Sequence, residues 1–223
     1  MKTYKKNFDL LKKNNVYSED MEHDACGVGL IASTEGKKSR NVVEYGIEAL
    51  KAVWHRGAVD ADGKTGDGAG IHVEIPKDFF IEKIEVTGHT HDSSDICVGM
   101  IFLPRNDYAA QESCKTIVES ELTKNDFNIY GWRQVPVNPK VLGEKAFQTM
   151  PEIIQVLFKP HNKELTNKDL ERKIYETRRK IENEAFKKSL NNFYICSISS
   201  KSIIYKGMFL AEAISEFYLD LND

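Results

Sequence analysis

The stretch of sequence that decides the fold is Cys26-Gly27-Val28-Gly29-Leu30-Ile31-Ala32. Residues 1–25, which precede it, are polar and lack a sustained apolar period, so they indicate a removable or loosely held leader. A short apolar run that begins abruptly and ends at a turn is typical of a buried strand. The turn is Ser33-Thr34-Glu35-Gly36. The sequence therefore predicts a core strand with a cysteine at its head.

Cys26 is a candidate nucleophile if the leader is removed. A free cysteine thiol has a pKa near ~8.5 and needs a base or positive surroundings to react. Cleavage between Ala25 and Cys26 would create an α-amino group, with an ordinary pKa of about 7.7–8.0, on the same residue as the thiol. That amine can accept and return the thiol proton, and Gly27 lets a substrate approach closely. The alternative is that Cys26 only begins a core strand, since buried cysteines are common.

Apolar periodicity and capping residues predict the elements that follow. They are a helix from Ser39 that ends at His55-Arg56-Gly57, a strand at Ile71–Ile75, a strand at Ile96–Leu103, a helix from Asn106 or Asp107 to Leu122, strands at Asn128–Trp132 and Ile153–Phe158, a helix capped by Thr166 and Asp169, and a hairpin of Phe193–Ser199 and Ile203–Tyr205 that turns at Ser200-Lys201. Strands in pairs, without strict βαβ alternation, favour one α+β domain with largely antiparallel sheets covered by helices.

Charge and hydropathy exclude several classes of partner. The chain has 31 basic and 34 acidic residues and a formal charge of −3, so nothing favours binding to nucleic acid or to a membrane surface. No apolar run approaches the roughly 18 residues of a membrane span, and none of about 7–15 residues follows the lysines of the leader as in a secretory signal. We therefore expect a cytoplasmic protein without a nucleic-acid or membrane partner.

The other cysteines give no sign of a metal site or a disulfide framework. Cys97, Cys114 and Cys196 are widely spaced and stand in apolar surroundings, without a CxxC pair. We expect all three to be small buried apolar residues.

A glycine- and aspartate-rich loop from Asp60 to Gly70 suggests two further sites. Gly63-Lys64-Thr65 resembles part of a phosphate-binding loop, but position 58 is alanine where that motif needs glycine. Asp60, Asp62 and Asp67 suggest calcium, but the later glutamate of an EF-hand is missing. The favoured interpretation is a glycine loop in which aspartates cap turns.

Histidines suggest one further site. His89, His91 and Asp92 could bind a metal, but they lie in the polar segment 87–95, which favours a solvated loop. His55 precedes Arg56 and is expected to be structural, because an N-terminal nucleophile needs no histidine base. No metal site is predicted.

Several of these segments together resemble one family. The quoted stretch at 26–32, followed by a helix and His55-Arg56-Gly57, is similar to the start of the class II glutamine amidotransferases. The loop at 61–71 resembles the glutamate synthase branch of that family. The other similar segments are Ile75-Pro76 with Phe79-Phe80, Gly131-Trp132-Arg133-Gln134-Val135-Pro136, Val141-Leu142-Gly143, Phe193-Tyr194-Ile195-Cys196-Ser197 and Tyr205-Lys206-Gly207-Met208.

This resemblance implies a fold and a site. The fold is an N-terminal-nucleophile (Ntn) hydrolase sandwich of four layers, αββα, incomplete at its C-terminal end, with residues 1–25 as propeptide and 26–223 as part of the amidotransferase domain. Cys26 is the implied catalytic nucleophile, and its freed amine is the base. Arg56, Gly27 and Gly57 are the implied substrate-pocket residues for L-glutamine.

The resemblance also implies partners and a limit. Ammonia released from glutamine would aminate 2-oxoglutarate in a synthase region of the same or a separate polypeptide, with FMN, an iron–sulfur cluster and possibly a small electron-transfer subunit, none of them held by this chain. The electron donor, nicotinamide or ferredoxin, stays open. The family's Asn-Gly oxyanion donor and its carboxylate-binding arginine have no match here, and losing one oxyanion donor costs roughly 10²–10³ in rate. We therefore expect this chain alone to be a poor glutaminase or an inactive one. The alternatives are a catalytically incomplete fold or docking module, or a free-standing cysteine hydrolase.

Overall fold

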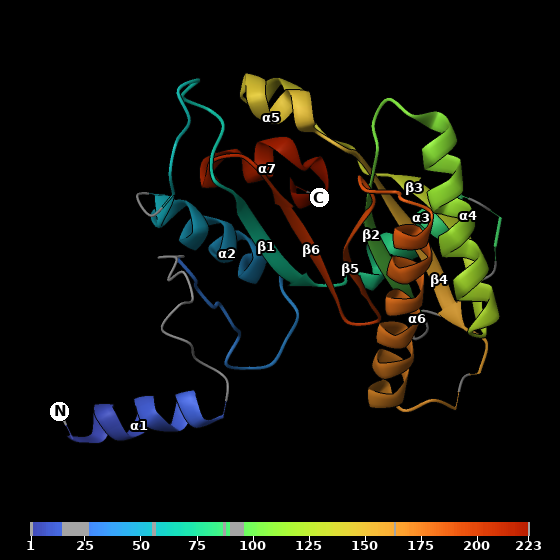
Figure 1. Cartoon of the computed structure of the whole chain (residues 1–223), viewed down its shortest axis with the longest axis horizontal. Helices are drawn as coiled ribbons and strands as arrows, with labels where there is room; N and C mark the ends of the chain where they lie inside the picture. Colours follow the sequence, from blue (N-terminus) through green and yellow to red (C-terminus); the bar gives the residue numbers. More distant parts are fainter. Residues whose placement is uncertain are drawn as a thin grey trace.

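The structure is a computed structural model that describes residues 2–14, 27–54, 57–86, 88–89, 96–162 and 164–222 (Figure 1). The helices are α1 (Lys2–Lys13), α2 (Arg40–Ala52), α3 (Lys77–Glu85), α4 (Tyr108–Lys124), α5 (Glu144–Thr149), α6 (Asn167–Lys187) and α7 (Ile214–Phe217), with 3-10 turns η3 (Pro139–Val141), η4 (Ala211–Ala213) and η5 (Leu219–Asn222). The strands are β1 (Ala69–Glu74), β2 (Cys97–Leu103), β3 (Phe127–Gln134), β4 (Glu152–Pro160), β5 (Tyr194–Ser199) and β6 (Ser202–Gly207).

The described strands form two antiparallel sheets. β1 pairs with β6, so that Ile71 lies opposite Tyr205 and Val73 opposite Ile203. The other sheet has the order β3-β4-β2-β5, and each neighbouring pair in it is antiparallel. The predicted α+β class with antiparallel sheets is therefore confirmed.

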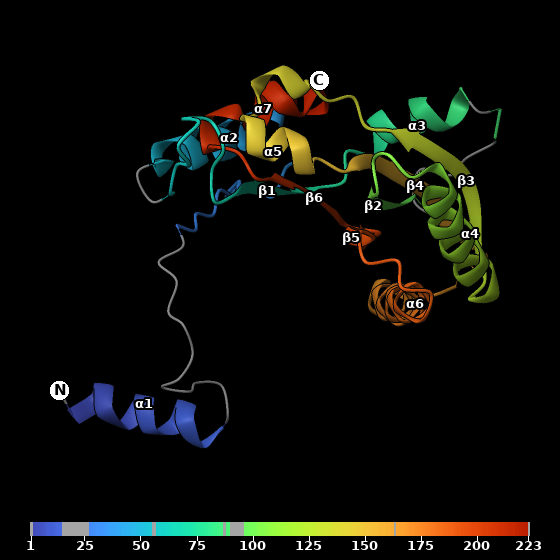
Figure 2. The same ribbon diagram turned by 45° about the horizontal axis from the view of Figure 1, so that its top comes forward.

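The larger sheet belongs to a module that is inserted between β1 and β6 in the sequence. Along the chain its elements follow the order β2, α4, β3, β4, α6, β5, and in the sheet the two central strands are β4 and β2. Helices α4 and α6 lie on one face of this sheet and α3 on the other (Figure 2). This is the ferredoxin-like βαββαβ arrangement. We call residues 97–199 the inserted module.

Two hydrophobic cores follow from this layering. One lies between the inserted sheet and its two helices, where Ile101, Val118 and Ile181 are fully buried. The other fills the space between the opposite face of that sheet, α3, the β1–β6 pair and the C-terminal segment, and it includes Phe80 and Tyr218. The second core is the one that supports the candidate site.

Side-chain caps begin the helices where the sequence predicts them. The Ser39 side chain accepts from the Asn41 amide (3.2 Å). Asp107 likewise accepts from Ala110 (2.9 Å), and Thr166 accepts from Asp169 (3.2 Å). An accepting oxygen at this position satisfies an amide that has no partner within the helix, which fixes the first turn.

The predicted strand at residues 26–32 is wrong for the part that the structure describes. Residues 27–33 are extended but belong to no sheet, and Val28 and Leu30 are 91% and 89% exposed. A strand needs a hydrogen-bonded neighbour, and among the described strands none pairs with this segment. The segment has the apolar pattern of a strand but no neighbour to pair with among the described strands.

The predicted hairpin at Ser200-Lys201 is also wrong. β5 pairs with β2 and β6 pairs with β1, so the chain passes from one sheet to the other at this turn. Glu171 of α6 holds the turn by accepting from the Ser200 amide (2.7 Å) and the Ser200 hydroxyl (2.6 Å). These bonds favour the crossing over a local strand pair.

Four of the described helices, α1, α3, α5 and α7, were not predicted. α1 forms within the leader, and it lies apart from the rest of the chain (Figure 1). Lysine and leucine are good helix formers, so local propensity is sufficient there. α3 follows Pro76, which ends β1 and supplies the N-cap position. α5 is short and begins after Gly143.

Candidate functional site

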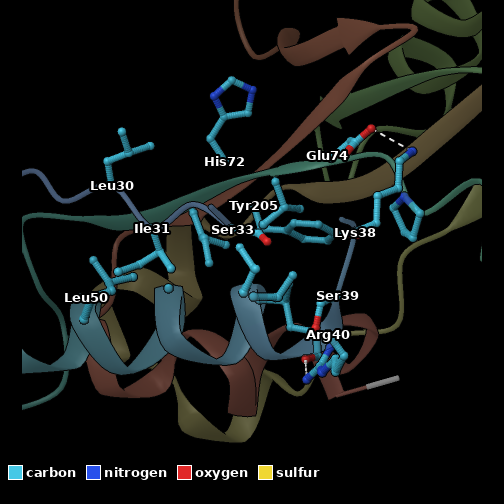
Figure 3. A pocket seen from close by; sticks show the side chains of 18 of the residues that line it. Leu30, Ile31, Ser33, Lys38, Ser39, Arg40, Leu50, His72, Glu74 and Tyr205 are labelled. Atoms are coloured by element: carbon cyan, nitrogen blue, oxygen red, sulfur yellow. Dashed lines mark hydrogen bonds and ion pairs between the residues drawn. The ribbon is translucent and has the colours of Figure 1, made fainter. Parts of the chain in front are cut away.

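A groove of about 1320 Å³ lies between helix α2 and strand β1 (Figure 3). Its walls are largely apolar, with Val43 and Leu50 from the helix and Ile71 and Val73 from the strand. The extended segment 27–33 runs along it, and Tyr205, Asp220 and Leu221 also line it. These parts are far apart in the sequence, so the groove is a product of the tertiary fold.

Helix α2 lies close to β1 because of a glycine on its inner face. A Cβ at Gly46 would lie 3.3 Å from the Cδ1 atom of Ile71, which is closer than ordinary van der Waals contact. Ile47, one residue further, is buried in the core below. The glycine therefore sets the separation of the groove's two walls.

The segment that begins at Gly27 runs along the groove from one end toward the other. Gly27 itself lines the groove. Leu30 and Ile31 lie at the end of the groove where Leu50 stands, whereas Arg40 lies at the other end (Figure 3). The chain thus runs from Gly27 along the groove and returns through α2.

Gly57 follows α2 and packs against the glycine-rich loop. Its amide donates to the Trp54 carbonyl at 3.1 Å, and a Cβ at this position would lie 3.2 Å from Oδ1 of Asp67. A side chain at Gly57 would therefore crowd this turn. Cys26, His55 and Arg56 lie outside the described residues.

The glycine-rich loop folds as a hairpin with an aspartate at its centre. Val59 and Gly66 form an antiparallel bridge. Asp62 accepts from the Thr65 hydroxyl (2.6 Å) and from the amides of Thr65 (2.7 Å) and Lys64 (3.0 Å). The Thr65 hydroxyl, followed by these amides, lowers the pKa of Asp62 well below its ordinary value. The interpretation as an aspartate-capped turn is confirmed.

Close packing joins this loop to two other parts of the chain. A Cβ at Gly66 would lie 2.8 Å from the carbonyl oxygen of Phe209. A Cβ at Gly143 would lie 2.6 Å from the Thr65 amide nitrogen. Segments from three parts of the sequence therefore meet beside the start of β1, and only glycine fits at the contacts.

An ion pair at the Arg40 end of the groove was not predicted. Arg133 of β3 donates to both carboxylate oxygens of Asp220, each at 2.7 Å, and to Oε1 of Gln155 at 2.8 Å. The side chains of Arg133 and Asp220 are 16% and 1% exposed. The segment Gly131–Pro136 contains an indication of this pair, because a charged residue such as Arg133 within an apolar strand needs a buried partner of opposite charge.

Burial and charge act on Tyr205 at the same end. Burial, reinforced by the nearby Asp220 carboxylate, raises the pKa of Tyr205 above its ordinary value. Its ring packs edge-on against Tyr218 at 5.1 Å. Tyr205 is therefore a neutral wall of the groove at physiological pH.

The described residues include no group of three histidine, cysteine, aspartate or glutamate side chains that could hold a metal ion. His89 instead packs edge-on near Tyr130, with the ring centres 6.0 Å apart; His91 and Asp92 lie outside the described residues. Burial raises the pKa of the Cys114 and Cys196 thiols to about 11, so both are poor ligands. An iron–sulfur cluster needs several thiolates together, and these cysteines do not fit one.

Comparison with known proteins identifies the family. Residues 26–223 match the model of the family described as "Glutamine amidotransferases class-II". The chain belongs to this family. In this amidotransferase chain the match begins at Cys26, so it excludes the segment that holds α1.

Relatives of this amidotransferase are glutamate synthases. The chain is 53% identical, over 99% of its length, to the large chain of the NADPH glutamate synthase of Azospirillum brasilense. It is 41% identical over 91% of its length to ferredoxin-dependent glutamate synthase 1 of Arabidopsis thaliana, and 39% identical over 90% to that of Cyanidium caldarium. It spans 14%, 12% and 13% of the length of these relatives.

Within the described ranges, no helix combines the length and the apolar character that crossing a bilayer requires.

Proposed function

We propose that this chain is the glutaminase portion of a glutamate synthase and that Cys26 is its nucleophile. The observation that carries the proposal is the place of Gly27. This residue is bonded directly to Cys26 and lines the groove between α2 and β1. The family match, which begins at Cys26, supports cleavage after Ala25.

The proton transfers and the nucleophilic attack of the proposed reaction use the two groups of an N-terminal cysteine and water. The α-amine takes the proton from the thiol, and the sulfur attacks the side-chain carbonyl carbon of L-glutamine. The tetrahedral intermediate collapses as its carbon–nitrogen bond breaks, and the departing nitrogen takes the proton and leaves as ammonia. Water then attacks the thioester, with the amine again as base, and releases glutamate and the free thiol.

Arg56 and Gly57 are proposed to shape the substrate pocket. A side chain at Gly57 would crowd Asp67, which supports a requirement for glycine at this turn. A guanidinium suits a carboxylate or a set of carbonyl oxygens, because its donors form a rigid fork.

We further propose the four-layer αββα sandwich for the completed domain. One edge of β1 pairs with β6, and its other edge faces the groove that segment 27–33 occupies. That segment carries a strand-like apolar pattern with exposed side chains, so docking it on β1 would bury them. Residues 1–25 are proposed to be a propeptide, removed before this strand can form.

The synthase reaction is proposed for the whole enzyme and not for this chain. Ammonia would aminate 2-oxoglutarate in a region that supplies FMN and an iron–sulfur cluster, since the cysteines described above do not fit a cluster. The higher identity to an NADPH enzyme than to the ferredoxin enzymes supports a nicotinamide donor. The cytoplasmic location stays a prediction.

Intact-mass measurement and glutamine turnover test the proposal together. In the full-length enzyme the chain should begin at Cys26 and hydrolyse glutamine, and Cys26→Ser should abolish hydrolysis while ammonia-dependent glutamate formation is kept. A retained leader with no turnover would instead favour a fold or docking module. Turnover that survives Cys26→Ser would overturn the assignment of the nucleophile.

A further inference from the structure

The inserted module reaches the groove through Arg133. The guanidinium group lies in the inserted sheet, 5.1 Å above the ring of Phe79, and grips Asp220 through both carboxylate oxygens. Phe79 and Asp220 both line the groove. A planar guanidinium held on one side by an aromatic ring and on the other by a bidentate carboxylate has a fixed orientation.

The segment around Asp220 is tied to the inserted module and to α2. The Leu219 amide donates to the Pro136 carbonyl (3.2 Å), directly after β3. The Leu221 carbonyl accepts from Arg40, the first residue of α2. These bonds connect β3 through Asp220 and Leu221 to the N-terminal turn of α2.

Helix α2 leads from this contact toward the proposed catalytic end. It is continuous over residues 40–52, and the Gly57 amide donates to the Trp54 carbonyl a few residues beyond its end. We infer that Arg133 is a positioning residue of the glutaminase pocket: its pair with Asp220 sets the place of α2, and through it the place of Gly57, which follows the helix. The inserted module is thereby coupled to the pocket. This inference rests on the proposed function for its catalytic consequence only.

Arg133→Lys tests the coupling, with Arg178→Lys as its matched control. Lysine keeps the charge but cannot bind both oxygens of Asp220 as the guanidinium does. Arg178 also lies in the inserted module, where it pairs with Glu182 (2.8 Å) and donates to the Ile195 carbonyl (2.8 Å) on the helical side of the sheet. Both variants replace the guanidinium group of an arginine in the inserted module. Only Arg133→Lys weakens a contact with residues that line the groove.

In the full-length enzyme, Arg133→Lys should lower kcat/KM for glutamine about tenfold or more, chiefly by raising KM. Small displacements of groups that position the substrate have large effects on the reaction. Arg178→Lys should leave kcat/KM unchanged. Hydrogen exchange of the amides at residues 40–52 should become faster only in Arg133→Lys. Equal kinetic losses in both variants, or unchanged exchange in α2, would overturn the coupling. Absence of glutamine hydrolysis by the wild type would refute the proposed function but not the coupling. The exchange rates of the α2 amides in the two variants would still test the coupling.

Discussion

Gly46 of α2 faces Ile71 of β1 so closely that a Cβ on the glycine would lie 3.3 Å from Cδ1 of the isoleucine. The contact sets the width of the groove along which the chain leads away from Gly27. A larger residue at position 46 must push the helix from the strand or force Ile71 into another rotamer.

Gly46→Val should therefore destabilise the protein by about 1–3 kcal/mol, as overpacking does. Ala52→Val, at the exposed end of the same helix, is the matched control and should change stability by less than about 0.7 kcal/mol. Chemical denaturation measures both. Equal effects of the two substitutions would show that the Gly46–Ile71 contact does not limit the groove.

The turn at which the chain changes sheets depends on Glu171. Replacing it with alanine removes the acceptor of the Ser200 amide and hydroxyl. We expect a loss of about 2 kcal/mol in the free energy of unfolding, because these donors are left without a partner. Glu176→Ala, on the same helix, removes an exposed pair with Arg172 and should cost less than about 1 kcal/mol. Thermal unfolding of the two variants compares them directly.

The hairpin around Asp62 should weaken in acid. Its carboxylate has a lowered pKa in the folded protein, so its contribution is complete above the ordinary pKa of the unfolded chain and is lost as the pH falls through the folded value. Protection of the Lys64 and Thr65 amides, corrected for the intrinsic exchange rate at each pH, should fall below about pH 4. In Asp62→Asn this pH dependence should be absent. If the variant and the wild type titrate alike, Asp62 does not hold the loop.

Thiol reactivity should separate Cys26 from the buried cysteines. At a pKa of about 11, Cys114 and Cys196 are ionised to only about one part in a thousand at pH 8. We expect one fast-reacting thiol in the native protein and four after denaturation, counted with a chromogenic disulfide. Cys26→Ser should remove the fast reaction. A second fast thiol in the native protein would contradict the burial of the other three.

Local sequence predicted most elements of this chain because the interactions that start and end them are local. Ser39, Asp107 and Thr166 each cap a helix through an amide two or three residues away. Pro76 ends a strand, and Asp62 folds its own loop. The family motifs are likewise contiguous, so the sequence alone led to the amidotransferase family and to Cys26, Gly27, Arg56 and Gly57 as candidates.

Only the tertiary structure decided which elements become partners. Segment 27–33 has the pattern of a strand, but its pairing depends on residues distant in sequence, and no pattern within it names them. Likewise β5 and β6 are adjacent in sequence and yet join different sheets, because Glu171 holds the turn between them. The pair of Arg133 and Asp220 joins residues 87 positions apart. Such contacts depend on how the whole chain packs, which local propensity does not determine.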